Sequence, residues 1–362
     1  MKNSIGNTLT VTLFGESHGE EIGAVLDGIT PGLPVNEEHI RLRLAQRRPC
    51  GAISTARREE DAFRIVSGVK DGVTTGAPLA ILIPNTDTRS ADYAAMGDLA
   101  RPSHADLAAR AKYHGYEDRR GGGHFSGRLT APLVALGSIA LDALAAKGIF
   151  VGTHLKQMGG VFDRDFENAG EDIRSLQGTA FPTLSREAGE RMQAAILAAK
   201  EAGDSLGGLL ECIVTGMPQG VGEPWFDGVE GVLARALFAI PAVKGVEFGD
   251  GFALAAMRGS EANDPWRALD GTVTSPTNHN GGINGGITNG MPLLMRIAVK
   301  PTPTIGIAQD TVDLTTGENA TLAARGRHDP AIAHRARAVV DGVVALTLCD
   351  LLLGRFGTDY LK

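Results

Sequence analysis

Apolar residues along this chain follow two periods, and the order in which the two alternate is irregular. Short runs typical of β-strands occur at residues 9–14, 22–26, 79–83, 149–154, 209–214 and 293–299. Longer patterns typical of helices occur at residues 37–47, 128–146, 185–202, 229–238 and 331–353. A doubly wound parallel sheet would need strands and helices in strict alternation. The sequence therefore predicts an α+β fold.

The chain gives no sign of a boundary between domains or of a covalent framework. It contains no linker, low-complexity tract or repeat of fixed period, and we predict a single domain over residues 1–362. Its three cysteines lie far apart and form no C-x-x-C pair, which argues against disulfides and zinc. Cys212 and Cys349 are predicted to be core residues. No metal is expected.

Charge and hydropathy argue against two classes of partner. The formal net charge is -7 and aromatic residues make up 5% of the chain, so the sequence lacks the basic field and aromatic pattern of a nucleic-acid-binding protein. It has no continuous apolar run of about 18 residues and no signal-peptide layout at its N-terminus. We predict a cytoplasmic protein with no nucleic-acid or membrane partner.

Glycine is frequent and clustered. The chain has 48 glycines, and some of them gather at residues 121–123, 281–282 and 285–286. Such clusters permit positive φ angles and let the backbone approach a ligand closely. The long polar segments 101–127 and 260–289 contain these clusters, and long structured loops commonly carry function.

Residues 15–19 read Gly-Glu-Ser-His-Gly, which fits the G-x-S-x-G pattern of a hydrolase nucleophile elbow. An elbow needs a helix after its strand, whereas here another short apolar run follows. A nucleophilic Ser17 is therefore disfavoured, and a serine hydrolase is kept only as a rival hypothesis. His18 is the alternative functional residue, beside the simpler interpretation of a histidine in a turn.

Residues 122–128 have the spacing of a phosphate-binding loop and lead into a predicted helix. Arg128 replaces the lysine of that loop, Leu129 replaces its metal-binding hydroxyl, and no buried strand precedes it. A nucleoside triphosphatase is therefore improbable. Glycine-rich backbone before a helix N-terminus and an arginine still predicts a site for an anion.

Two further segments combine histidine with charged residues. Asp329 and Pro330 are predicted as the N-cap and first residue of the last helix, but capping does not account for Arg327 and His328 beside them. In the other segment, His104 lies between an arginine and a carboxylate in the loop at residues 101–106. Together these features indicate an enzyme that acts on a small polyanion. A non-enzymatic anion- or flavin-binding module is the rival from another class.

The motifs of this chain resemble those of the chorismate synthase family, in order and along nearly the whole sequence. The matching blocks are FGESHG (14–19), RRP (47–49), RREED (57–61), GVTTGAPLAILIPNTD (72–87), RPSHAD (101–106), RGGG (120–123), GDSLGG (203–208), GEP (222–224), AVKGVEFGDGF (242–252), GGINGG (281–286), KPT (300–302) and GRHDP (326–330). The resemblance implies a lyase of the shikimate pathway to aromatic amino acids. This enzyme converts 5-enolpyruvylshikimate 3-phosphate to chorismate and phosphate by a 1,4-anti elimination, which needs reduced FMN without net redox change.

The resemblance also implies a fold, an assembly and roles for residues. The implied fold is a single-domain β-α-β sandwich with helices layered between antiparallel sheets, assembled as a homotetramer. His18 would serve the leaving phosphate, His104 would protonate or stabilise the reduced flavin near N1, and Asp329 would help the flavin N5 remove the ring C6 proton. NADPH is the expected upstream reductant, used by this enzyme or by a separate reductase. The residues expected to contact the flavin or bound anions are Arg47, His124, Phe125, Ser126, Arg128, Gly285, Lys300, Pro301, Thr302, Pro303, Thr304 and Arg327.

The sequence departs from the common family pattern near the glycine cluster. His124 and Phe125 stand where the family usually has Arg-Ser, so one arginine and one hydroxyl are missing and His124 is expected to remake part of the contact. Pro241 replaces an asparagine, which removes a side-chain amide and a backbone donor. An arginine often found shortly after the RRP block has no counterpart at residues 50–56. These changes indicate a divergent branch of the family.

Overall fold

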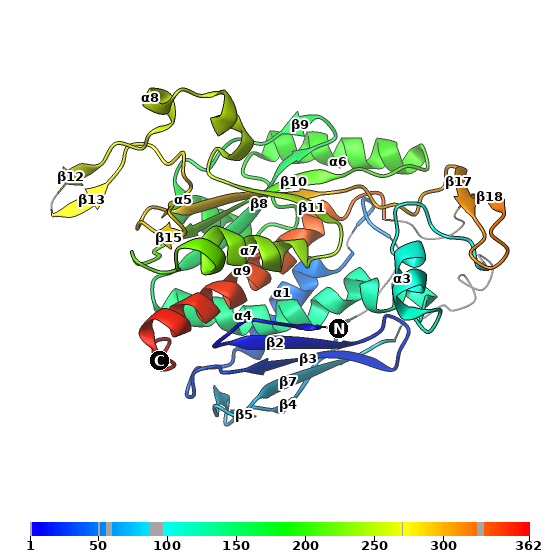
Figure 1. The fold of residues 1–362 in the computed structure, drawn as a ribbon, viewed down its shortest axis with the longest axis horizontal. Helices are drawn as coiled ribbons and strands as arrows, with labels where there is room; N and C mark the ends of the chain where they lie inside the picture. The colour runs from blue at the N-terminus through cyan, green and yellow to red at the C-terminus, as the bar shows by residue number, and fades with distance from the viewer. Residues whose placement is uncertain (1, 50, 56–59, 87–96, 270, 324–328) are drawn as a thin grey trace.

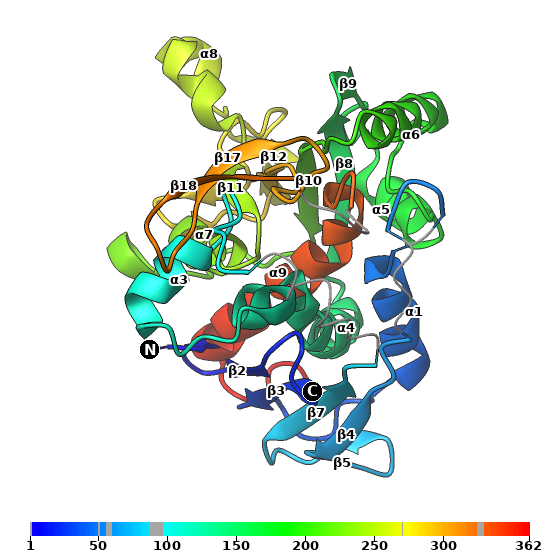
Figure 2. The same cartoon turned by 90° about the vertical axis from the view of Figure 1, so that its right-hand side faces the viewer.

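The computed structural model describes residues 2–49, 51–55, 60–86, 97–269, 271–323 and 329–362. Two five-stranded antiparallel sheets lie on either side of a layer of helices (Figure 1). A view at right angles gives the same order of layers (Figure 2). The predicted α+β class and the layering of helices between sheets are therefore confirmed.

The first sheet comes from the N-terminal part of the chain and has the strand order β1-β2-β3-β7-β4. Alternate residues of β7 are buried, which is the pattern of a sheet with one face on the core. Its strands are β1 (Ser4–Ile5), β2 (Thr10–Gly15), β3 (Glu21–Asp27), β4 (Arg64–Ser67) and β7 (Leu79–Pro84), and β5 (Val69–Lys70) pairs separately with β6 (Val73–Thr74).

The second sheet has the order β11-β16-β10-β8-β9 and is covered on both faces near β8. Thr153 of β8 donates to Asp341 of α9 on one face, whereas a Cβ at the adjacent Gly152 would lie 2.8 Å from Ile173 of α5 on the other. Consecutive residues of β10 are likewise buried, from Leu210 to Val214, as expected for a strand covered on both faces. The strands are β8 (Phe150–Met158), β9 (Val161–Phe162), β10 (Gly208–Thr215), β11 (Val243–Phe248) and β16 (Leu293–Val299).

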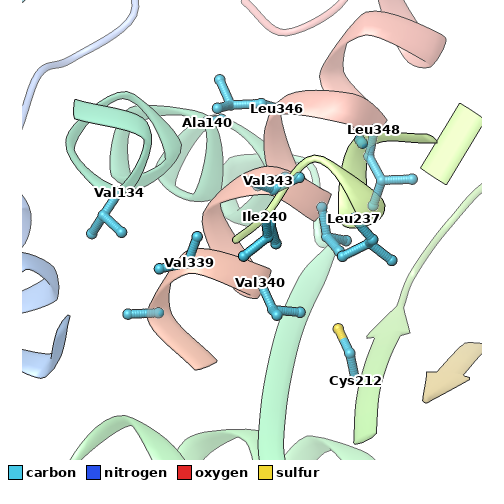
Figure 3. Packing of buried hydrophobic residues seen from close by; sticks show 14 of the residues in the cluster. Val134, Ala140, Cys212, Leu237, Ile240, Val339, Val340, Val343, Leu346 and Leu348 are labelled. Carbon is cyan, nitrogen blue, oxygen red and sulfur yellow. The ribbon is translucent and has the colours of Figure 1, made fainter. Parts of the chain in front are cut away.

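Helices α4 (Thr130–Ala146) and α9 (Ala333–Phe356) cross in direct backbone contact between the sheets. A Cβ at Gly137 of α4 would lie 2.3 Å from the Cα atom of Gly342 in α9, so Gly137 has no room for a side chain, and one at Gly342 would be tightly packed at 3.3 Å from the Leu133 carbonyl oxygen. Figure 3 shows side chains of α9 packed with those of α7 (Val229–Phe238) and with Cys212 of β10. Cys212 and Cys349 are fully buried, which confirms them as core residues.

The segment Gly127–Ala146, which contains α4, is long and apolar enough to cross a membrane by composition alone. However, 72% of the most apolar stretch in this segment is buried inside the protein. This burial is typical of a core helix, which must be apolar on all sides when neighbours surround it. The hydropathy of α4 is therefore explained by its central place in the fold.

The remaining elements lie around this core. They are α1 (Glu37–Arg47), α3 (Asp106–Tyr113), α5 (Ala169–Gln177), α6 (Arg186–Glu201), α8 (Gly259–Ala262), β12 (Arg267–Leu269), β13 (Thr272–Thr274), β14 (Ile283–Asn284), β15 (Ile287–Thr288), β17 (Gln309–Val312) and β18 (Asn319–Leu322). Short 3₁₀ turns are η1 (Arg120–Phe125), η2 (Gly127–Leu129), η3 (Trp225–Asp227) and η4 (Gly251–Ala256).

The predicted elements agree with the observed ones at the long periodic segments. The bounds of α1, α7 and β16 are as predicted, and the other predicted strands and helices are present with shifted ends. The elements that were not predicted are short or polar and include α3, α5, β4 and β11. One boundary is a correction that bears on the site: α9 begins at Ala333 with Ile332 as its N-cap, so Asp329 does not cap it and Pro330 does not begin it.

Candidate functional site

The segment with His18 is the turn between strands β2 and β3, which pair as an antiparallel hairpin with Gly15 opposite Ile22. Since a strand rather than a helix follows the turn, the geometry of a nucleophile elbow is absent here. Asn85 fixes the turn by donating to the carbonyls of Glu16 at 3.0 Å and Gly19 at 2.8 Å. Ser17 is fully buried, and its hydroxyl has no hydrogen-bond partner among the described residues.

The three consecutive glycines at residues 121–123 form a turn that contacts both candidate histidines. Each has a positive φ, at 60°, 88° and 52°. A Cβ at Gly121 would lie 2.4 Å from Cδ2 of His18, and one at Gly122 would lie 3.4 Å from Nε2 of His104. The backbone N–H of Ser17 also donates to the Gly123 carbonyl at 3.1 Å. This glycine turn therefore brings His18 and His104 together.

His104 is oriented by the carboxylate predicted beside it. Its Nδ1 donates to Asp106 at 3.1 Å, and Arg101 donates to the same carboxylate through Nε and Nη2 at 2.8 and 2.6 Å. Burial alone would raise the pKa of Asp106, but hydrogen bonds from Arg101 and His104 outweigh it and hold that pKa well below its ordinary value. A carboxylate at Nδ1 fixes the ring and leaves Nε2 toward the glycine turn.

Asp118 is a second carboxylate beside the glycine turn. Arg120 donates to it through Nε and Nη2 at 2.9 and 2.8 Å. These hydrogen bonds, with a smaller contribution from the nearby charge of His18, lower the pKa of Asp118. The imidazole of His18 and the carboxylate of Asp118 therefore lie close enough to interact electrostatically beside the glycine turn.

Arg47 and Arg128 share one buried carboxylate, that of Asp61. The Asp61 side chain is 0% exposed, accepts from Nη2 of Arg47 at 2.8 Å and pairs with Nη1 of Arg128. Burial would raise the pKa of Asp61, but the two arginine charges and their hydrogen bonds lower it.

Arg47 and Arg128 differ in whether a guanidinium donor is available to a ligand. Arg128 also donates to Asn85 and to the carbonyl of Pro84, so all three of its nitrogens have protein partners. Nε of Arg47 is buried and has no partner among the described residues. A buried donor without a partner is a place where a bound anion would complete the hydrogen bonding.

Asp329 lies in an ion pair instead of at a helix cap. Its Oδ2 accepts from Nη2 of Arg335 at 2.6 Å, and its Oδ1 accepts from the backbone N–H of Thr55 at 3.1 Å. The cap was predicted because aspartate before a helix usually caps it. Here the first turn of α9 begins three residues beyond Pro330, and an arginine on that turn binds the carboxylate.

The altered residues after the glycine turn contact the protein itself. Nδ1 of His124 donates to the carbonyl of Gly15 at 2.9 Å, which ties the glycine turn to the β2–β3 turn. Phe125 is partly exposed and packs edge-on against Tyr113 of α3. Ser126 accepts from the backbone N–H of Arg128 at 3.3 Å and caps the turn before α4. Their contacts with a flavin stay a prediction.

The segment 300–304 lies beside the loop that carries His104. Nζ of Lys300 donates to the carbonyl of Ser103 at 2.5 Å, and Ser205 donates to the carbonyl of Thr302 at 2.7 Å. The Thr302 hydroxyl is buried and has no partner among the described residues. Pro303 and Thr304 are half-buried, whereas Pro301 is exposed and its ring lies close to Gly207.

Of the predicted binding residues that the structure describes, Gly285 lies away from this cluster. Gly285 has φ 61° at the tip of the β14–β15 hairpin, on the side of the molecule away from α3 (Figure 1). Arg327 lies outside the described residues. Within the described ranges, no group of three or more histidine, cysteine, aspartate or glutamate side chains could hold a metal ion.

Sequence reasoning missed Asp61 and Arg335 as members of the site. Asp61 ends the RREED block, but nothing local shows that it binds Arg128. Its φ of 52° is an unusual backbone conformation that no sequence pattern indicates. Arg335 lies in an apolar helix and gives no signal of its own. Asp61 binds one partner that is 67 residues away in sequence, whereas Arg335 binds Asp329, which lies before the start of its helix.

The chain is similar to known proteins over nearly its whole length. The family model for chorismate synthase matches residues 9–353. A chorismate synthase from Aeropyrum pernix is 46% identical over 355 residues, covering 98% of this chain and 93% of the relative. One from Pyrococcus abyssi is 47% identical over 350 residues, covering 97% of both. A crystal structure of a chorismate synthase has a TM-score of 0.78 at 30% identity, covering 98% of this chain and 94% of that one.

Proposed function

The chain belongs to the chorismate synthase family, and from that premise we propose how its residues divide the work of the reaction. The enzyme converts 5-enolpyruvylshikimate 3-phosphate to chorismate and phosphate, a 1,4-anti elimination in the shikimate pathway to aromatic amino acids. A proton must leave ring C6 while the C–O bond to phosphate breaks. The family requires a reduced flavin, although the reaction has no net redox change.

We assign His18 to the departing phosphate. Supporting this role, the imidazole lies against the glycine turn and near the carboxylate of Asp118. A protonated imidazole can stabilise or protonate the leaving oxygen, as a general acid does. Nε of Arg47 would donate to an anionic group of the substrate, since it is buried and lacks a partner among the described residues.

We assign Asp329 to the proton that leaves C6. A carboxylate can accept this proton, and Thr55 and Arg335 hold both of its oxygens in place. Asp329 and His18 would thus act on opposite ends of the elimination, while His104 would contact the flavin. The observation that carries the proposal is the contact of one glycine turn with both His18 and His104.

The residues near His104 fit a flavin that carries a phosphate, and we propose FMN. The unpartnered hydroxyl of Thr302 and the ammonium of Lys300 offer a donor and a cation for the phosphate. His104 would present its Nε2 to the flavin ring, because its Nδ1 donates to Asp106. Bound reduced FMN would supply an electron-rich ring to the allylic system of the substrate.

We further propose a single cytoplasmic domain that assembles as a homotetramer and uses NADPH as the upstream reductant. The net charge of -7 and the burial of α4 support a protein that binds neither nucleic acid nor membranes. Gly285 and Arg327 would contact the cofactor in that assembly. Gel filtration with light scattering tests the tetramer directly.

The function is tested anaerobically with 5-enolpyruvylshikimate 3-phosphate and dithionite-reduced FMN, following chorismate absorbance and released phosphate. Equal amounts of the two products are expected, and only with reduced flavin. Oxidised FMN serves as the control. No product from folded protein that binds FMN would mean that the changes at His124, Phe125 and Pro241 have removed the activity. A flavin-binding module without turnover would then be the better description.

Gly121→Ala is expected to lower kcat/KM by about 10²-fold, because an added methyl group would displace the His18 ring and a misplacement near 1 Å has an effect of that size. The Cβ would lie 2.4 Å from the imidazole, at a φ of 60° that alanine rarely adopts. Gly148→Ala is the matched control, since Gly148 also has a positive φ, of 75°, but its Cβ would meet no atom within 4 Å. Equal activity of the two variants in the anaerobic assay would contradict the role of the turn.

A further inference from the structure

Arg335, on the first turn of α9, binds the carboxylate of Asp329. Their closest atoms are 2.6 Å apart, and the two side chains are only 14% and 20% exposed. The other oxygen of Asp329 accepts from the backbone N–H of Thr55. Two donors from different parts of the chain therefore fix the plane of this carboxylate, and a partly buried arginine pair of this kind is more rigid than one on the surface.

The same guanidinium also reaches the C-terminal end of α1. Its Nη1 donates to the carbonyl of Arg47 at 3.4 Å, while the Arg47 side chain binds Asp61. The Arg335 side chain thus contacts both Asp329, the proposed proton acceptor, and the backbone of Arg47, whose buried Nε has no partner among the described residues. The planar fork of arginine suits this task because its donors keep a fixed separation, whereas lysine offers a single ammonium.

We propose that Arg335 is a positioning residue for the elimination. It holds the carboxylate of Asp329 at a fixed position relative to the C-terminal end of α1, where Arg47 lies. The inference rests on the proposed role of Asp329 in proton removal. Arg335 itself would touch neither substrate nor cofactor. It acts by setting where the proton acceptor lies relative to the bound substrate.

A purely structural ion pair makes a different prediction. Its loss would lower thermal stability and the amount of folded enzyme, but the enzyme that remains folded would react normally. Loss of positioning would instead slow proton removal in folded enzyme. The isotope effect on kcat with substrate deuterated at C6 separates the two, because it rises when proton transfer becomes slower than the other steps and does not depend on the folded fraction.

The test compares Arg335→Gln and Arg335→Lys with Arg296→Gln as the matched control. Arg296 pairs with Glu247 at 2.6 Å on the second sheet, with exposures of 19% and 23%. Arg335→Gln is expected to lower kcat by about 10²-fold, at the lower end of the range for general acid–base groups, with KM changed less than about threefold. The isotope effect should rise, the FMN affinity should be unchanged by fluorescence, and Arg335→Lys should fall between. Arg296→Gln should lose thermal stability but keep kcat.

A double-mutant cycle with Asp329→Asn separates this inference from the proposed function. If Arg335 acts through Asp329, the double variant should be no slower than Asp329→Asn alone. Normal kcat in Arg335→Gln, or a lower kcat with an unchanged isotope effect, overturns the positioning role. Full activity of Asp329→Asn removes Asp329 from the reaction whatever Arg335 does. If Arg335→Gln fails to fold, the isotope effect of Arg335→Lys decides.

Discussion

Asp329→Asn is expected to lower kcat for chorismate formation by about 10²- to 10⁴-fold, the usual contribution of a general acid–base group. The amide has nearly the shape of the carboxylate, and its oxygen can still accept from Thr55 or Arg335. It cannot accept the proton that leaves C6. The anaerobic assay measures kcat, and FMN fluorescence measures cofactor binding, which should persist.

Glu247→Gln is the matched control for this variant. Glu247 also receives a guanidinium from Arg296 at 2.6 Å, but it lies on the second sheet in β11. The same chemical change there should leave kcat unaltered. Full activity in Asp329→Asn would exclude Asp329 from the mechanism, and equal losses in the two variants would point to a general effect of breaking ion pairs.

Asp61→Asn is expected to lower the free energy of unfolding by about 3–5 kcal/mol, because removing one partner of a buried ion pair leaves the other charge uncompensated. Here two arginines, Arg47 and Arg128, would lose their shared counter-charge. Urea unfolding at pH 7 and fixed protein concentration measures the change. Glu37→Gln is the control, since its pair with Arg41 is exposed and such helix pairs contribute about 0.3–0.5 kcal/mol.

The difference in the free energy of unfolding between wild type and Asp61→Asn should depend on pH. The arginines lower the pKa of Asp61 in the folded state, whereas the unfolded value is about 3.9. The ionised carboxylate therefore stabilises the fold above about pH 4, and this stabilisation is lost as the pH falls through the folded-state pKa. The stability difference between wild type and Asp61→Asn should be constant from about pH 7 to 5 and shrink below about pH 4. A difference that stays constant down to pH 3 would contradict the assignment.

The sequence predicted the parts of the fold whose signals are local. The bounds of α1 follow from its periodicity and from Asn36, which caps it by accepting from the N–H of His39. The short helix α3 was missed because it lies in a polar loop where no apolar pattern marks it. The start of α9 was misplaced because Asp329 pairs with Arg335 instead of capping the helix, which begins at Ala333.

The site could be predicted only in part for a similar reason. His18, His104 and the glycine turn belong to contiguous motifs, so a resemblance finds them. The contacts of the Asp61 side chain depend on where α1 and α4 begin and end in space, which no local pattern specifies. His124 is expected to remake a flavin contact, which stays a prediction, and the structure adds that its Nδ1 ties two turns of the protein together.

Because α4 and α9 touch at Gly137 and Gly342, a change in their crossing angle would move the ends of both helices. Both begin on the side of the molecule where the site residues lie (Figure 1). Their first turns are roughly 10–14 Å from Gly137 and Gly342 at 1.5 Å per residue. A tilt of about 5° at the crossing would therefore move the helix starts by about 1 Å, which is enough to impair catalysis. Substitutions at Gly137 or Gly342 would therefore lower activity by displacing the starts of the helices, although neither residue contacts the site. Substitutions that leave cavities elsewhere in the core would mainly lower stability.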